Sequence, residues 1–127
     1  MTESASTHES PDDADPPVAL PLAVEALREA HAIAFTLMLN GVSRAAFVIR
    51  ADGALYAFVD SCRHQSRSLD LGAGPALQDG LLPCRHHGAL YRVSDGSCVV
   101  GPCAGTRLTK LALEERAGRW WCVGRAG

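Results

Sequence analysis

Short apolar runs alternate with turn-forming dipeptides along most of the chain. Three runs in the first half are rich in β-branched and aromatic residues, and they occupy Ile33–Leu39, Ala45–Ile49 and Ala54–Val59. Asn40-Gly41 separates the first two, and Asp52-Gly53 separates the last two. Asn-Gly and Asp-Gly are strong hairpin signals because such turns need positive φ at both central residues. The pattern therefore predicts three consecutive antiparallel strands.

The same signal recurs near the C-terminus, where Leu108–Glu115 and Arg119–Val123 flank Ala117-Gly118. This arrangement predicts a last hairpin. Near the other end, Pro21–Ala30 combines helix formers with a proline that suits a first helical turn, so we expect a short helix there. Strands dominate, and the expected fold class is all-β.

Charge divides the chain into two parts. Five of its 14 acidic residues lie in residues 1–17, which contain no Lys or Arg, so we expect a disordered acidic tail there. The remaining residues 18–127 carry 12 basic and nine acidic residues, a net charge of plus three. With 127 residues and 47% hydrophobic residues, the chain suits one domain with a modest core.

The five cysteines are an odd number in a chain that starts without a secretory signal pattern. Thiols or metal ligands in a reducing, cytoplasmic location are the expectation, and Cys98, Cys103 and Cys122 are expected to be buried thiols. No apolar run approaches the length of a membrane span.

The candidate chemistry lies in two short boxes. Cys62 and His64 form C-x-H, Cys84 and His87 form C-x-x-H, and nineteen residues separate the boxes. Two thiolates and two neutral imidazoles suit either zinc or an iron-sulfur cluster with mixed ligands. Because each box pairs one cysteine with one histidine, both sulfurs can bind one metal and both nitrogens a second.

The sequences C-R-H and C-R-H-H-G resemble the paired boxes of Rieske iron-sulfur proteins. Further matches to that family lie at Leu69 and Tyr91. Asp95-Gly96 resembles the family's turn, and Gly101-Pro102 resembles its proline-containing loop that covers the cluster. The resemblance runs from about Val42 to Val123. It implies an antiparallel β-sandwich with a small cluster-binding subdomain of loops inserted between strands. We expect the Rieske 2Fe-2S domain to span residues 18–127, with its cluster-binding part at about 60–103.

Two departures place the chain nearest the soluble Rieske ferredoxins. High-potential respiratory members have a serine where this chain has Ala89, and they have extra cysteines where it has Arg67 and His86. Ser66 also replaces a common glycine, and the gap between the boxes is slightly long. The missing hydroxyl at Ala89 favours the lower half of the Rieske potential range, which is about −150 to +300 mV.

The resemblance implies one 2Fe-2S cluster per chain, with Cys62 and Cys84 on the inner iron and His64 and His87 on the outer iron. The expected function is one-electron transfer from a reductase to a terminal oxygenase, with partners docking at the exposed histidine end. Arg63, Arg67 and Arg85 could form a basic rim that steers an acidic partner.

No substrate, nucleic-acid or membrane site is visible in the sequence, so we expect an electron-transfer protein and not an enzyme by itself. Two alternatives stay open. One is the small subunit of a nitrite-reductase-like enzyme, which keeps the fold. The other is a zinc-stabilised interaction module.

Overall fold

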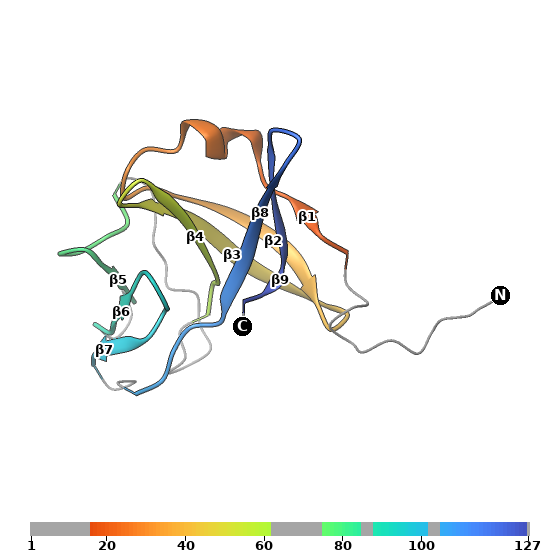
Figure 1. Cartoon of the computed structure of the whole chain (residues 1–127). Coiled ribbons are helices and arrows are strands. Elements are labelled where there is room, and N and C mark those ends of the chain that lie inside the picture. The colour runs from red at the N-terminus through yellow and green to blue at the C-terminus, as the bar shows by residue number, and fades with distance from the viewer. Residues whose placement is uncertain (1–15, 62–74, 85–87, 102–104, 127) are drawn as a thin grey trace.

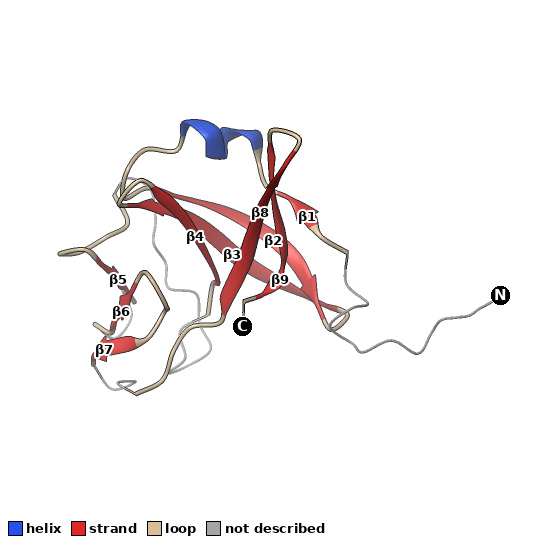
Figure 2. Cartoon of the chain, in the orientation of Figure 1, coloured by secondary structure: helices blue, strands red, loops and turns tan. Residues whose placement is uncertain are grey.

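A computed structural model describes residues 16–61, 75–84, 88–101 and 105–126 of the chain. Within these ranges the regular structure is antiparallel strand apart from one short helical turn, and loops and turns connect the strands (Figures 1 and 2). The expected all-β class is therefore confirmed. The acidic segment that the sequence predicts to be disordered lies outside the described residues, apart from Pro16 and Pro17.

Most strands belong to one large sheet of six strands in the order β1-β9-β8-β4-β3-β2. In chain order these strands are β1 (Val18–Ala19), β2 (Ala32–Leu39), β3 (Val42–Ala51), β4 (Ala54–Val59), β8 (Lys110–Arg116) and β9 (Arg119–Arg125). The strands β2, β3 and β4 form the expected consecutive hairpins, with Leu39 opposite Val42 and Ala51 opposite Ala54.

The three turn dipeptides have the positive φ angles that tight hairpins need. Both residues of Asn40-Gly41, of Asp52-Gly53 and of Ala117-Gly118 have φ between 52° and 79°. Positive φ at both central positions is the type I′ geometry that matches strand twist in a tight hairpin. All three predicted hairpins are therefore confirmed.

A second, smaller sheet is inserted between β4 and β8 in the chain. It has the order β5-β6-β7, and its strands are β5 (Leu81–Pro83), β6 (Leu90–Arg92) and β7 (Cys98–Val100). Figure 1 shows it beside the large sheet, at the left of the view. The sequence predicted an inserted subdomain of loops, and the structure gives part of that insertion regular pairing.

The predicted helix over Pro21–Ala30 is shorter and tighter than expected. Only Leu22–Ala26 is helical, as the 3-10 turn η2, and Leu27 is already extended. Arg50 explains the early end, because its guanidinium donates to the Val24 and Leu27 carbonyl oxygens at 3.3 and 2.7 Å. A side chain from β3 thus satisfies carbonyls that a longer helix would have paired.

The large sheet buries both of its faces. Along β3 the side chains alternate, so Phe47 and Ile49 pack towards the small sheet while Ala46 and Val48 face a second apolar cluster. All four are at most 3% exposed. The second cluster lies on the opposite face of β3 and includes Leu20 and, from η2, Val24. β3 is therefore the layer that both cores share.

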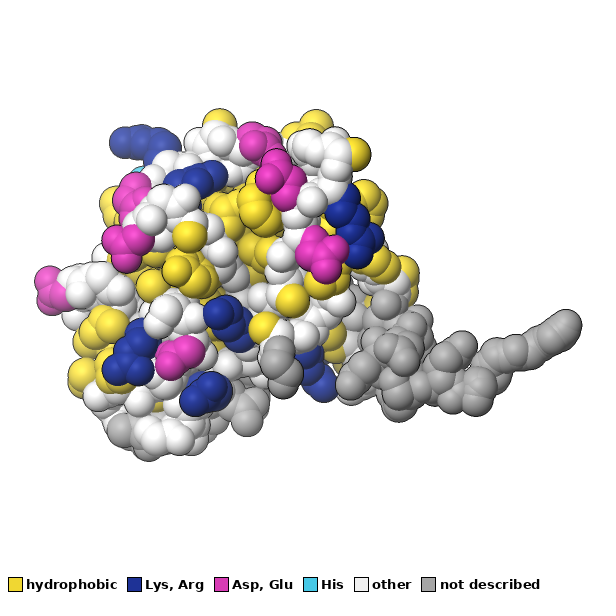
Figure 3. Space-filling model, viewed as in Figure 1, with side chains coloured by type: hydrophobic (Ala, Val, Ile, Leu, Met, Phe, Trp, Pro, Cys, Tyr) yellow, Lys and Arg dark blue, Asp and Glu magenta, His cyan; other side chains and the backbone are white. Residues whose placement is uncertain are grey.

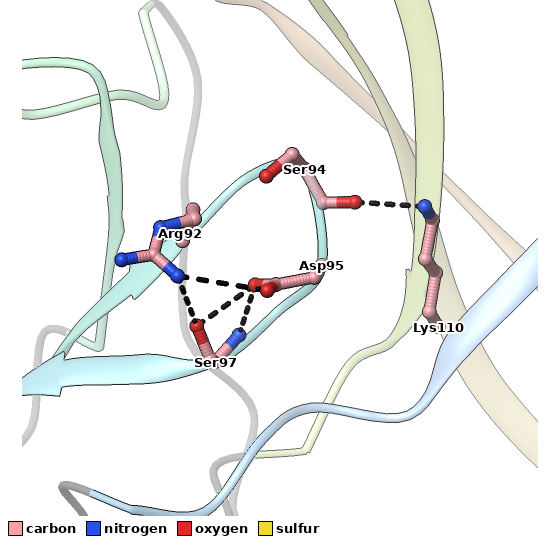
Figure 4. Close-up of polar contacts among 5 residues, drawn as sticks. All are labelled: Arg92, Ser94, Asp95, Ser97 and Lys110. Atoms are coloured by element: carbon pink, nitrogen blue, oxygen red, sulfur yellow. Dashed lines mark hydrogen bonds and ion pairs between the residues drawn. The ribbon is translucent and has the colours of Figure 1, made fainter.

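The β6–β7 turn joins the two sheets. Gly96 packs against this junction, because a Cβ built on it would lie 2.8 Å from Phe58 Cε1 of β4. Lys110 Nζ of β8 donates to the Ser94 carbonyl oxygen at 2.7 Å (Figure 4). These contacts fix the orientation of the small sheet relative to the large one. Among the described residues, no helix has the length and hydropathy needed to cross a membrane.

Candidate metal centre

Cys84 follows directly after β5 and starts the second predicted box. Its backbone N–H donates to the Ala89 carbonyl oxygen at 2.8 Å, and the Gly88 N–H donates to the Cys84 carbonyl oxygen at 3.0 Å. Because Pro83 pairs with Leu90 in the same ladder, both ends of the box are held by strand pairing. The second box therefore begins and ends between two paired strands, β5 and β6.

The surroundings of Cys84 are apolar. Its side chain is fully buried in a cluster with Leu82, Ala89, Tyr91 and Leu108, all at most 1% exposed. No polar or charged residue in the described part of the chain is buried. A bare thiolate is costly in such surroundings, whereas a thiolate bound to a cation is stable there. Burial, position and donor chemistry at Cys84 therefore fit a metal ligand.

A small hollow lies beside this thiol. It has a volume of about 260 Å³, and its described lining residues are Gln78, Pro83, Cys84, Gly88 and Leu90. The lining comes from both strands of the β5–β6 hairpin and from the segment before it. None of these described lining residues is charged.

The chain after β7 returns across this hairpin. Gly101 has φ of +105°, and a Cβ built on it would lie 2.9 Å from Ala89 Cα. The backbone at Gly101 therefore lies directly against the closing end of the second box. The loop that the sequence predicts to cover the cluster begins at Gly101, and its other predicted residue, Pro102, lies outside the described residues, so the covering role stays a prediction.

Behind the box, the β6–β7 turn is held by a compact polar network (Figure 4). The Asp95 carboxylate accepts hydrogen bonds from Ser97 N at 2.9 Å and Ser97 Oγ at 2.8 Å. Arg92 Nη1 lies 3.6 Å from the same carboxylate. The Ser97 hydrogen bonds, the backbone one foremost, lower the pKa of Asp95 below its ordinary value. This turn confirms the one expected at Asp95-Gly96.

The other predicted ligands are not placed. Cys62, His64 and His87 lie outside the described residues, and so do Arg63, Arg67, Arg85, His86 and Cys103. The first box begins three residues after the end of β4, since Asp60 and Ser61 precede Cys62. The four-residue ligand set therefore stays a prediction, supported at Cys84. No group of three potential ligands occurs within the part that the structure describes.

The remaining described cysteines have other surroundings. Cys98 lies in β7 and donates to the Val100 carbonyl oxygen, with Sγ at 3.3 Å. Cys122 lies in β9, in the core of the large sheet, and burial raises its pKa. Both are buried, as expected, and no disulfide joins the cysteines in the described ranges.

The sequence analysis did not identify Lys110 as a candidate functional residue, although it is the only lysine of the chain. The structure places its Nζ at the β6–β7 turn, where it donates to the Ser94 carbonyl oxygen.

The fold and the boxes can be compared with known proteins. A family model described as "Rieske [2Fe-2S] domain" matches residues 23–113. No curated protein matches the sequence.

Among solved structures, the chain is similar to one in a complex of reduced oxygenase and oxidised ferredoxin of carbazole 1,9a-dioxygenase. The identity is 20% and the TM-score 0.67, covering 87% of this chain and 96% of that chain. The carbazole 1,9a-dioxygenase ferredoxin from Nocardioides aromaticivorans IC177 matches at 20% identity and TM-score 0.65, over 84% and 96%. The terminal oxygenase from Novosphingobium sp. KA1 matches at 21% identity and TM-score 0.68, over 88% of this chain but 30% of the oxygenase.

Proposed function

The chain belongs to the Rieske [2Fe-2S] domain family, and from that premise we propose that it is a one-electron carrier between a reductase and a terminal oxygenase. The match over residues 23–113 carries the proposal, because it spans both predicted boxes and most strands of both sheets. The family's cofactor is one 2Fe-2S cluster of the Rieske type. When bound, such a cluster takes up and releases single electrons, which is the chemistry that a carrier needs.

We assign the cluster ligands as the sequence predicted them. Cys62 and Cys84 would hold one iron, and His64 and His87 would hold the other. The burial of Cys84 and the strand pairing around it support this assignment, because a ligand on a rigid hairpin keeps its position when the charge of the centre changes. The proposed domain boundaries follow: residues 18–127 for the whole and about 60–103 for the cluster-binding part.

The proposed ligand set affects the reduction potential of the cluster. Two neutral imidazoles in place of two thiolates make the centre less negative, so it accepts an electron more readily than a four-cysteine centre. Ala89 is fully buried beside Cys84 and offers only a methyl group, so its side chain cannot donate a hydrogen bond to the cluster. We therefore propose a potential in the lower half of the range of about −150 to +300 mV.

The small sheet also exposes apolar surface that suits a partner. Val99 and Val100 of β7 are 38% and 47% exposed, and they directly precede Gly101 at the second box. Exposed aliphatic side chains next to a redox centre favour docking there, because contact shortens the path for the electron. We propose that both partners dock at this end, where the histidine ligands would lie. For carbazole 1,9a-dioxygenase, one solved structure is a complex of the oxygenase with its ferredoxin.

The carrier would work in the cytoplasm and leave substrate chemistry to its partner. The extent of the similarity supports a carrier, since the chain covers 96% of the ferredoxin chain and 30% of the oxygenase. The nitrite-reductase-like subunit and the zinc module remain the alternatives that an experiment must separate from it.

The test is metal analysis of the protein purified without oxygen, on the full chain and two matched variants. We expect a red-brown protein with two irons and two sulfides, and loss of both in Cys84→Ala. Cys122→Ala removes a cysteine that is equally buried, but in the core of the large sheet, and should keep the full metal content. One zinc without iron, or metal loss in both variants alike, would contradict the proposal. Reduction by a reductase without delivery to any oxygenase would favour the nitrite-reductase-like alternative.

A further inference from the structure

A hollow of about 520 Å³ lies on the flank of the molecule, and Cys84 is not among its described lining residues. It is formed by the segment that leads into β8, by the C-terminal end of β9 and by Asp95 of the β6–β7 turn. Its charged lining residues are Arg107, Lys110, Arg125 and Asp95. Figure 3 shows lysine and arginine side chains gathered on this lower part of the face, between the small sheet and the C-terminus.

The described lining of the hollow is net positive. It has three cations and one carboxylate, and that carboxylate accepts hydrogen bonds from Ser97 N and Ser97 Oγ and also interacts with Arg92 and Arg107. Lys110 is held in place, since Nζ donates to the Ser94 carbonyl oxygen at 2.7 Å and lies 5.5 Å from the centre of the Tyr56 ring. An ammonium group has three N–H donors, and this carbonyl takes one of them. The site therefore suits carboxylate groups.

The chain itself carries a segment of the matching charge. Residues 1–15 contain five acidic residues and no Lys or Arg, and they are Glu3, Glu9, Asp12, Asp13 and Asp15. Three of them are the acidic residues closest to β1. The segment lies outside the described residues, but the strand that follows it is placed.

The register of β1 gives the direction in which this segment starts. Val18 pairs with Cys122 and Ala19 with Trp121, antiparallel. The N-terminal end of β1 therefore points towards the Arg125 end of β9, and Pro16 and Pro17, which have no N–H to continue the ladder, precede it. Fifteen residues can extend over about 50 Å, at about 3.3 Å per residue. The acidic segment is thus joined to the end of β1 that points towards the Arg125 end of β9, and its length is sufficient to reach the hollow.

We propose that the acidic segment of residues 1–15 binds, within the same chain, in the basic hollow formed by Arg107, Lys110 and Arg125. Exposed ion pairs are individually weak, but tethering gives the segment an effective concentration on the order of millimolar. Intramolecular binding would therefore prevail over an acidic partner at micromolar concentration. The segment would screen this flank and leave the cluster end as the surface for redox partners. The proposal goes beyond the electron-carrier function and does not depend on it.

The single lysine makes the test specific. Zero-length carbodiimide coupling joins a lysine amine to a carboxylate in contact with it, with loss of one water, and Lys110 is the only lysine. We expect a product of monomer mass in which Lys110 is joined to Asp12, Asp13 or Asp15. Its yield should not depend on protein concentration, and it should fall several-fold at about 1 M salt, where the Debye length is about 3 Å.

Matched variants show whether the hollow itself holds the segment. Arg107→Gln with Arg125→Gln removes two exposed charges from the hollow, and Arg28→Gln with Arg116→Gln removes two exposed charges elsewhere. The first pair should lower the yield several-fold and the second should leave it unchanged, with the circular dichroism of all forms alike. Coupling of Lys110 to Asp95 alone, coupling only between two chains, or equal yields in both pairs would overturn the proposal.

Discussion

The contact between Gly101 and Ala89 offers a sharp test of how the second box is held. Gly101→Ala would place a methyl group 2.9 Å from Ala89 Cα and 3.3 Å from Ala89 Cβ. The first neighbour is backbone, so it cannot rotate away as a flexible side chain would. The Ala89 carbonyl oxygen accepts the hydrogen bond from Cys84 N. A shift of Ala89 is therefore transmitted to the predicted ligand.

Two costs add in this variant. A residue other than glycine at φ of +105° costs about 1–3 kcal/mol, and an extra methyl group in a filled site costs about 1–3 kcal/mol. Gly105 is a matched control, because its φ is +95° and a Cβ there meets none of the described residues within 4 Å. Gly105→Ala should show the backbone cost alone. The two variants should therefore differ by about 1–3 kcal/mol.

Urea unfolding of the metal-loaded protein measures this difference. With a slope of about 1–3 kcal/mol per molar urea, about 2 kcal/mol moves the midpoint by roughly 1 M. The visible absorption of the cluster reports the small sheet, while the fluorescence of Trp120 and Trp121 reports β9 in the large sheet. We expect Gly101→Ala to lower the absorption midpoint more than Gly105→Ala does. Equal midpoints would refute the packing argument, and a lower midpoint for Gly105→Ala would reverse it.

Three further predictions concern the junction, the turn and the metal. Gly96→Ala should lower the urea midpoint more than Gly118→Ala. Both glycines have φ of +78°, but within the described part of the chain only a Cβ at Gly96 would meet a neighbour, and equal effects would contradict this. Asp95 has a lowered pKa, so its ionised form stabilises the fold above about pH 4. The stability difference between the wild type and Asp95→Asn should therefore shrink as pH falls below about 4, and a constant difference would exclude this role. Removal of the metal by a chelator should raise hydrogen exchange in β5, β6 and β7 before β3 and β4, and simultaneous exchange would contradict separate support of the two sheets.

The large sheet could be predicted from sequence because its signals are local. Ala54–Val59 was predicted with its observed bounds, since the Asp52-Gly53 turn fixes where the strand begins. The end of η2 could not be predicted in the same way, because it depends on Arg50, more than 20 residues further along the chain. The helix propensity of Pro21–Ala30 was correct as a local tendency, and a tertiary contact overrode it.

The candidate metal centre also combines features that local sequence specifies with features that depend on tertiary contacts. The spacing of cysteine and histidine identified Cys84 as a ligand candidate without any knowledge of the fold. The strands on both sides of it, β5 and β6, have three residues each, too few to show a period of two. The approach of Gly101 to Ala89 joins residues twelve positions apart across a bulged ladder, and no local pattern specifies it.

The small sheet depends on the large one for its stability. Three strands of three residues cannot bury enough apolar surface to fold alone. Leu82 and Tyr91 are nevertheless fully buried, because Phe47 and Phe58 of the large sheet complete their core, with ring centres 5.9 Å apart. Phe47 and Phe58, which are not predicted ligands, therefore help to fix the position of the second box, which is proposed to bind the metal. Substitutions in β3 and β4 that enlarge this core should thus impair metal binding, although they lie in a different sheet from Cys84.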